Sequence, residues 1–149
     1  VLKASPGVEH RMEPCGQVNG VCFVNDSKGT NSDASMKALS ATSGGIVLVA
    51  GGYDKNSSFD DFIQAFDNKV KALVLLGKTA AQIKETAERH GFSNSIMVSS
   101  MEEAVSEAYK AAKPEDTVLL SPACASWDMY SCFEERGEHF KACVKNLEK

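Results

Sequence analysis

The 149-residue sequence lacks several features that define common protein classes. No apolar run approaches the ~20 residues that a membrane-spanning helix requires, and no basic segment precedes an apolar core as in a signal peptide. With 16 Lys and Arg against 20 Asp and Glu, the formal net charge is -4. Because nucleic acids and anionic membranes bind clustered basic surfaces, we expect neither of them as a partner.

Cysteine and histidine are present, but not in spacings that mark a disulfide framework or a metal site. The five cysteines are odd in number and none forms a Cys-x-x-Cys pair, which disfavours disulfides and zinc knuckles. His10, His90 and His139 are far apart in the sequence and lie in no recognisable metal motif. We therefore expect reduced thiols, no metal site, and a cytoplasmic, monomeric protein.

Three motifs of nucleotide binding and nucleophilic catalysis are also absent. The sequence contains no Gly-x-x-x-x-Gly-Lys-Ser/Thr phosphate loop, no Gly-x-Gly-x-x-Gly fingerprint after a strand and no Gly-x-Ser-x-Gly elbow. The chain therefore shows no complete catalytic apparatus of its own.

The sequence does contain the alternating strand and helix patterns of one α/β domain over residues 1–149. Residues 8–24 predict a β-hairpin that turns at Asn19-Gly20, with a first arm that Pro14 and Gly16 make irregular, as in an edge strand. Buried strand patterns follow at 46–50, 72–76, 96–98 and 117–120. We expect a three-layer, Rossmann-like fold with a mostly parallel sheet and helices on both faces.

Helix start and stop signals separate these strands. A helix is expected after Asn31, Gly91 and Pro114 are typical helix stops, and a last helix is expected from 130 to 147, either continuous or broken near Gly137. Three of the helices are predicted to begin with a side-chain cap, formed by Ser58 with Asp61, Thr79 with Gln82, and Ser100 with Glu103.

The loops at the carboxyl ends of the strands are the candidate binding segments, since open parallel sheets bind ligands there. The loops at 25–31, 51–57 and 121–128 hold most of the usable chemistry. Their candidate side chains carry carboxylate, hydroxyl or ammonium groups: Asp26, Ser27, Lys28, Thr30, Lys55 and Ser126. Two lysines with hydroxyls and helix N-termini suit an anion such as a carboxylate or a phosphate.

Each candidate also has a purely structural interpretation. Lys55 after a Gly-Gly turn is equally a solvated loop lysine. Thr30, Asn31 and Ser126 can each serve simply as a helix N-cap, and Phe133 on the last helix is by default a core residue. Their common position at one expected edge of the sheet is what favours the functional interpretation for all of them together.

Six segments carry a resemblance to a known family. They are His10-Arg11-Met12-Glu13, Asn19-Gly20-Val21, Asn25-Asp26-Ser27-Lys28-Gly29-Thr30-Asn31, Gly51-Gly52-Tyr53-Asp54-Lys55, Ser121-Pro122-Ala123-Cys124-Ala125-Ser126 and Phe133-Glu134-Glu135-Arg136-Gly137. In this order they resemble the C-terminal domain of the D-glutamate-adding members of the Mur ligase family, over nearly the whole chain.

The resemblance implies an ATP- and Mg²⁺-dependent enzyme of peptidoglycan precursor synthesis, and through it of cell shape and division. In such enzymes the carboxylate of UDP-N-acetylmuramoyl-L-alanine is phosphorylated and the amine of D-glutamate attacks the acyl phosphate. The Walker loop, the magnesium ligands and the UDP-sugar domain of the family are not in this chain. We therefore expect the chain alone to fold, to hold no cofactor and to be inactive.

The resemblance also assigns roles to individual residues. It implies a D-glutamate pocket made by Thr30, Lys55, Ser126 and Phe133 with the backbone of Trp127, Lys28 beside the reacting groups, and ATP contacts from Arg11 and Asp26. Two positions depart from the family pattern: Gly29 replaces an expected alanine, and Trp127 a leucine or phenylalanine. Both departures change bulk beside the site, so they bear on the shape of the pocket.

Two other interpretations of the sequence stay open at this point. One is another amide ligase domain of the same superfamily, of the Mur or folylpolyglutamate type, which the loops at 25–31 and 121–126 disfavour. The other is a stand-alone α/β module that binds a small anion.

Overall fold

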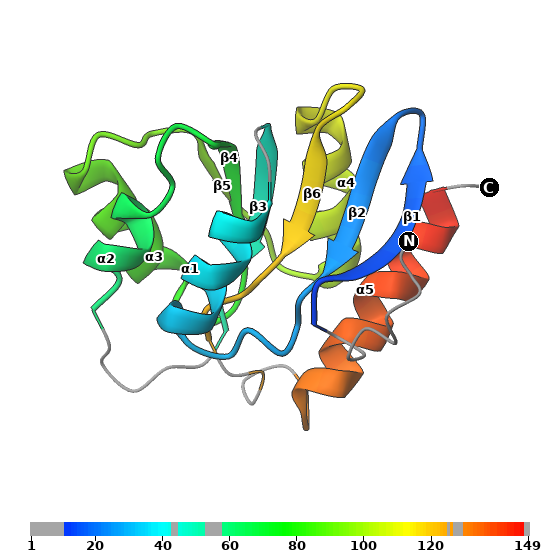
Figure 1. The fold of residues 1–149 in the computed structure, drawn as a ribbon. Helices are drawn as coiled ribbons and strands as arrows, with labels where there is room; N and C mark the ends of the chain where they lie inside the picture. The colour runs from blue at the N-terminus through cyan, green and yellow to red at the C-terminus, as the bar shows by residue number, and fades with distance from the viewer. Residues whose placement is uncertain (1–10, 43–44, 53–57, 125, 127–129, 148–149) are drawn as a thin grey trace.

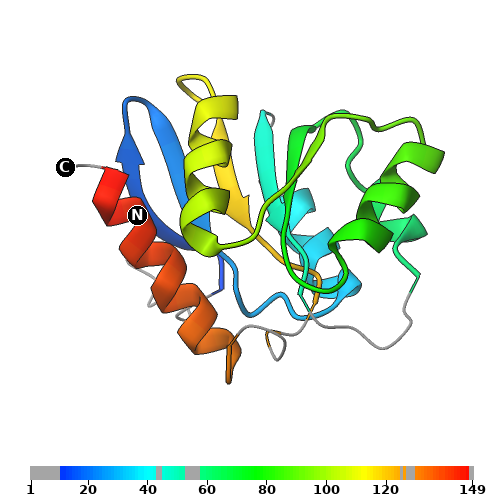
Figure 2. The same cartoon turned by 180° about the vertical axis from the view of Figure 1, so that it is seen from behind.

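The computed structural model describes residues 11–42, 45–52, 58–124, 126 and 130–147. They form a three-layer α/β domain around a six-stranded sheet (Figures 1 and 2). The strands are β1 (Glu13–Val18), β2 (Val21–Asn25), β3 (Ile46–Ala50), β4 (Val70–Leu75), β5 (Ser95–Met97) and β6 (Thr117–Leu120). The helices are α1 (Ser32–Ala41), α2 (Asp60–Gln64), α3 (Ala80–Arg89), α4 (Met101–Ala111) and α5 (Phe133–Leu147).

The sheet has the order β1-β2-β6-β3-β4-β5, and all its pairings are parallel except that of β1 with β2. The β1–β2 hairpin turns at Asn19 (φ 50) and Gly20 (φ 85), as the sequence predicts for an Asn-Gly turn. β1 lies at the edge and its register shifts between Pro14 and Gly16, so the predicted irregular edge strand is confirmed.

Two apolar cores lie on the two faces of the sheet. One core joins the sheet to α1, α2 and α3, with buried Leu39, Phe62 and Ile83 at its centre. The other joins the opposite face to α4 and α5, with buried Val105 and Phe140. Side chains alternate between the two cores along β3 because successive strand residues point to opposite faces. The predicted mostly parallel sheet with helices on both faces is confirmed.

Two predicted helix caps are wrong. The Ser58 hydroxyl bonds to Asp60, and α2 begins after Phe59 without a side-chain cap. Thr79 precedes α3 but makes no capping bond, because its hydroxyl is used by another loop. The predicted cap of α4 is confirmed, since the Ser100 Oγ accepts the N–H of Glu103 at 3.1 Å. The last helix is continuous through Gly137 and begins at Phe133, three residues later than expected.

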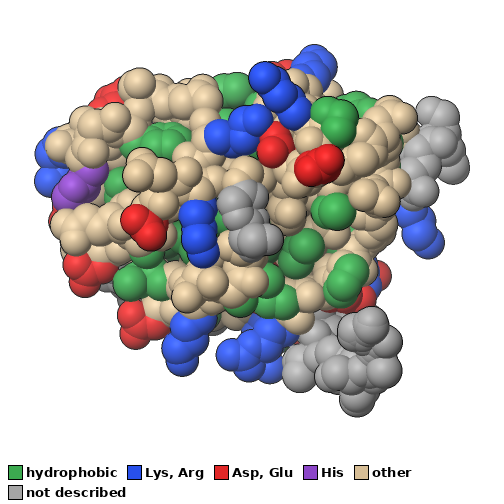
Figure 3. Space-filling view, turned by 45° about the horizontal axis from the view of Figure 1, so that its top comes forward, with side chains coloured by type: hydrophobic (Ala, Val, Ile, Leu, Met, Phe, Trp, Pro, Cys, Tyr) green, Lys and Arg blue, Asp and Glu red, His purple; other side chains and the backbone are tan. Residues whose placement is uncertain are grey.

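Among the described residues no helix combines the length and apolarity needed to cross a bilayer. On the face that Figure 3 shows, Lys and Arg side chains are interspersed with Asp and Glu side chains rather than gathered into one basic patch.

Candidate functional site

Three loops that follow parallel strands meet at one rim of the sheet. The N–H of Asp26, at the end of β2, donates to the carbonyl of Leu120 at the end of β6 over 2.7 Å. Beyond the strands, Ala123 N–H donates to the Gly29 carbonyl at 2.9 Å, and Gly51 N–H donates to the Pro122 carbonyl at 3.0 Å. The loops after β2, β3 and β6 are therefore joined directly by backbone hydrogen bonds, as the parallel arrangement of their strands requires.

Arg136 on α5 is the side chain that clamps two of these loops together. The residue is 4% exposed, and its guanidinium donates through Nε to Ser27 Oγ (2.9 Å), through Nη2 to Ser27 O (2.8 Å) and through Nη1 to Cys124 O (3.0 Å). Ser27 Oγ in turn donates to the Phe133 carbonyl at 2.7 Å. This role is not predictable from the sequence alone, since an arginine on a helix is by default a surface residue.

Thr79, which the sequence predicted to cap a helix, instead makes a second link between the rim loops. Its buried hydroxyl accepts the N–H of Gly52 at 3.0 Å and lies 3.3 Å from Cys124 Sγ. The hydroxyl thereby holds the Gly51-Gly52 turn against the loop after β6. The amide of Thr79 donates back to the Gly52 carbonyl at 3.1 Å.

Asp26 is the buried carboxylate of the rim. Its Oδ2 accepts the Ser121 hydroxyl at 2.7 Å and its Oδ1 accepts the Met12 N–H at 3.1 Å. Ser121 Oγ also lies 2.8 Å from the hydroxyl of Ser35 on α1. Burial raises the pKa of Asp26, while these hydrogen bonds and the Arg11 charge oppose the shift. The carboxylate is thus a fixed hydrogen-bond acceptor that joins the residue before the start of β1, the loop after β2 and the loop after β6.

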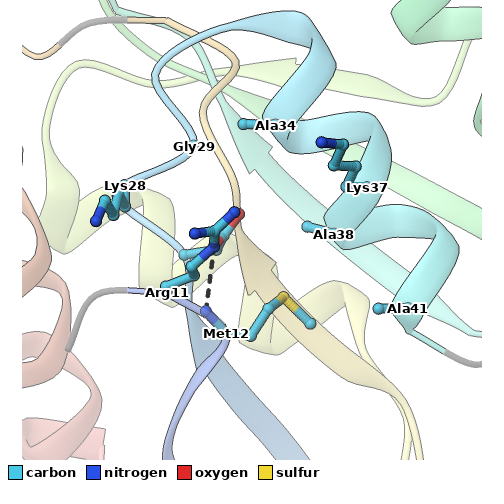
Figure 4. Close-up of a pocket in the computed structure, with 9 residues that line it drawn as sticks. Arg11, Met12, Lys28, Gly29, Ala34, Lys37, Ala38 and Ala41 are labelled. Carbon is cyan, nitrogen blue, oxygen red and sulfur yellow. Dashed lines mark hydrogen bonds between the residues drawn. The ribbon is translucent and has the colours of Figure 1, made fainter. Parts of the chain in front are cut away.

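A hollow of about 300 Å³ opens between the start of β1, the β2 loop and α1 (Figure 4). Three cationic side chains surround it: Arg11, Lys28 and Lys37. The rest of its lining is apolar or small and is contributed by Met12, Gly29, Ala34, Ala38 and Ala41. Cations over a small-residue floor suit a phosphate-bearing ligand with a flat apolar part. Lys37 is an addition to the candidates, and its helical position gave no signal in the sequence.

The structure places the candidate residues at the rim to different extents. Asp26 and Ser126 are buried, Thr30 and Phe133 are half-buried, and Arg11 and Lys28 are exposed. Lys55 and Trp127 lie outside the described residues. Asn31, not Thr30, caps α1, with its Oδ1 accepting the Ala34 N–H at 2.9 Å, so the Thr30 side chain is not required as the cap.

Residues 10–124 match the family model described as Mur ligase, glutamate ligase domain. The chain belongs to the Mur ligase family. The match includes the loop after β2, the Gly51-Gly52 turn and the first part of the loop after β6, as far as Cys124, whose carbonyl accepts a hydrogen bond from Arg136.

Sequence relatives refine this assignment. The chain is 54% identical over 150 aligned residues to the UDP-N-acetylmuramoylalanine--D-glutamate ligase of Thermoanaerobacter sp. (strain X514). The match covers 99% of this chain and 33% of that protein, so the chain spans about a third of the relative's length. Resemblance to this kind of Mur ligase was the prediction from the rim motifs, and it is confirmed.

Solved structures with low sequence identity show the same fold. The UDP-N-acetylmuramate-alanine ligase MurC of Thermotoga maritima matches with a TM-score of 0.64 at 13% identity, over 95% of this chain and 31% of that chain. A bifunctional folylpolyglutamate synthase/dihydrofolate synthase with Mn, AMPPNP and L-glutamate bound matches with a TM-score of 0.66 at 14% identity, over 95% of this chain and 32% of that chain.

Proposed function

We propose that this chain is the amino-acid-presenting domain of an ATP-dependent ligase that joins D-glutamate to UDP-N-acetylmuramoyl-L-alanine in peptidoglycan precursor synthesis. The observation that carries the proposal is the 54% identity to a D-glutamate ligase over 99% of the chain. The joined rim loops support it, because they bring the candidate side chains of the β2 and β6 loops to one edge. A cytoplasmic, monomeric enzyme that acts in cell-wall growth, cell shape and division is part of the same proposal.

D-glutamate brings two carboxylates, so its pocket must supply cationic and hydroxyl donors. Thr30 and Ser126 offer hydroxyls from the β2 and β6 loops, and Phe133 offers an apolar wall at the start of α5. Lys55 and the backbone of Trp127 complete the proposed pocket. Lys28, exposed beside Thr30, stands next to the reacting groups. Holding the amine against an activated carboxylate lowers the barrier by orientation, and the donors strengthen that hold by charge-assisted bonds.

The hollow beside α1 is the proposed contact surface for ATP. When ATP is bound, it supplies the phosphoryl group that activates the carboxylate of UDP-N-acetylmuramoyl-L-alanine. Arg11 and Lys28 offer positive charge to phosphate oxygens, and Asp26 offers carboxylate oxygens to a hydroxyl or amine of the nucleotide. The residues described around this hollow include a single carboxylate, that of Asp26, against three cationic side chains. They fit a nucleotide better than a magnesium ion, whose ligands we assign to the rest of the enzyme.

Turnover by the full-length enzyme tests this function. Phosphate release is measured with UDP-N-acetylmuramoyl-L-alanine, ATP and one of D-glutamate, lysine or diaminopimelate. We expect turnover with D-glutamate, and turnover only with lysine or diaminopimelate would assign the chain to another ligase. Ser126→Ala should lower kcat/KM for D-glutamate by about ten- to a hundredfold, the loss of a hydrogen bond to a charged group. Ser40→Ala, exposed near the end of α1, is the matched control.

A further inference from the structure

A cluster of three metal-ligand side chains lies away from the rim site, on the opposite face of the sheet. There α4 and α5 pack side by side (Figure 2). Glu102 in the first turn of α4 faces His139 and Cys143 on α5, and their ligand atoms all lie within 4.8 Å of one another. His139 and Cys143 are four residues apart, which places both on the same face of α5.

Imidazole nitrogen, thiolate sulfur and carboxylate oxygen are the three ligand types that Zn²⁺ takes from proteins. Bond lengths of roughly 2.0–2.3 Å in tetrahedral geometry put neighbouring ligand atoms about 3.3–3.8 Å apart. The Nε2 of His139 lies 2.9 Å from Oε2 of Glu102, and Cys143 Sγ lies within 4.8 Å of a ring nitrogen of His139 and of a carboxylate oxygen of Glu102. The three ligand atoms therefore already lie close to the spacing that a shared metal ion requires.

Tyr130 supplies the outer contact that a ligating histidine requires. Its hydroxyl lies 2.7 Å from His139 Nδ1. A metal on Nε2 requires the proton on Nδ1, and the tyrosine oxygen can accept that proton's hydrogen bond, which fixes the ring orientation. A phenolic hydroxyl can both donate and accept a hydrogen bond, so Tyr130 can accept the bond from a protonated Nδ1.

The cluster has both a route in from solvent and room for a further ligand. The Glu102 side chain is 66% exposed and that of His139 is 34% exposed, while Cys143 is buried. Beside them a hollow of about 140 Å³ is lined in part by Glu102, Cys143 and Asn146, enough for a water as fourth ligand. A metal ion that binds the Cys143 sulfur takes the place of the thiol proton, so binding releases that proton.

We propose that Glu102, His139 and Cys143 form a Zn²⁺ site that fastens α5 to α4. The site does not depend on the ligase function, because it lies on the other face of the sheet from the α1 hollow. A histidine–carboxylate pair in this chain does not by itself produce such a three-ligand cluster. His90 Nε2 lies 2.7 Å from Asp60 Oδ1, yet this pair is not part of any three-ligand cluster among the described residues.

Cobalt titration tests the proposal, because thiolate bound to Co²⁺ gives a strong near-ultraviolet charge-transfer band. We expect the reduced 149-residue chain to bind one Co²⁺ with this band and to lose the band when Zn²⁺ is added. Cys143→Ser should remove the band. His139→Gln and Glu102→Gln, at partly exposed positions, should each weaken Co²⁺ binding at least tenfold while leaving the circular dichroism spectrum unchanged.

Two matched variants control for non-specific binding. His90→Gln removes a histidine that also pairs with a carboxylate, and Cys132→Ser removes a cysteine close to α5 but outside the cluster. Both should change Co²⁺ affinity less than twofold. The proposal is overturned if no charge-transfer band forms at saturating Co²⁺, or if His139→Gln and Glu102→Gln bind no more weakly than His90→Gln. A band that survives Cys143→Ser would equally exclude the site.

Discussion

Replacing Arg136 tests whether one buried guanidinium holds the rim loops together. Arg136→Met keeps an unbranched side chain of similar helix propensity but removes the three hydrogen bonds of the guanidinium to Ser27 and Cys124. Arg136 is only 4% exposed, so water cannot replace these bonds without opening the rim. A net hydrogen bond contributes about 1 kcal/mol, and more when one partner is charged. Burial of the methionine side chain offsets part of the free energy lost with these hydrogen bonds, so the variant should be about 3 kcal/mol less stable to unfolding than the parent.

Urea unfolding of the chain, followed by circular dichroism, measures this difference. Arg89→Met is the matched control, because Arg89 has a 59% exposed side chain and lies 3.7 Å from Asp60. Such a surface ion pair contributes at most about 1 kcal/mol. Hydrogen exchange adds a local readout: the amide of Ala123, bonded to Gly29, should lose protection in Arg136→Met and keep it in Arg89→Met. Equal losses of stability in the two variants would refute the clamp.

Three further predictions address the turn after β3, the buried acid and the activity of the chain. Gly51→Ala should cost more than 3 kcal/mol in urea unfolding, because its Cβ would lie 2.0 Å from the Leu76 carbonyl oxygen; Gly91→Ala, also at positive φ but with no atom within 4 Å, should cost about 1 kcal/mol. Burial raises the pKa of Asp26 in the folded state above its ordinary value of 3.8, so the folded state binds this proton more tightly than the unfolded state does. The free energy of unfolding should therefore fall as the pH rises from about 4 through the folded pKa. Relative to Asp26→Asn, the parent should become less stable over this rise, and a stability difference that stays constant with pH would contradict the assignment. The chain alone should release no ADP and should bind D-glutamate with a Kd in the millimolar range or weaker, about -4 kcal/mol, since domain closure normally completes such a site; calorimetric titration checks the affinity, and a micromolar Kd would contradict it.

Local sequence patterns were sufficient to locate most elements of the fold. The strands at Ile46–Ala50 and Thr117–Leu120 and the turn at Asn19-Gly20 were predicted with the bounds observed. These signals depend on a few neighbouring residues, whether an apolar run or a pair that tolerates positive φ. The sequence did not specify that β6 lies between β2 and β3, because strand order depends on contacts between segments far apart in the chain.

Non-local contacts also explain where the sequence analysis failed. Thr79 has the sequence signature of a helix cap, but its hydroxyl instead accepts the Gly52 N–H from another loop. Arg136 is charged and helical, and only the fold reveals that it is buried between two loops. The proximity of Glu102 to His139 and Cys143 was not predicted for the same reason, since Glu102 comes from a different helix. The four-residue spacing of His139 and Cys143 was the one signal that could have pointed to it.

The structure also indicates that the two parts of the proposed ligase site share one rigid loop. Gly29 N–H donates to the Asp26 carbonyl and Thr30 N–H donates to the Lys28 carbonyl, each at 2.8 Å, so the loop after β2 consists of two tight turns. Ser121 holds its Asp26 end, and Arg136 holds Ser27 from the other side. Because a loop closed by such short turns has little freedom to deform, a displacement at Asp26 is carried to Thr30. The residues that we propose for the nucleotide and for the amino acid therefore lie on one loop, and we expect substitutions on either side to affect binding on both.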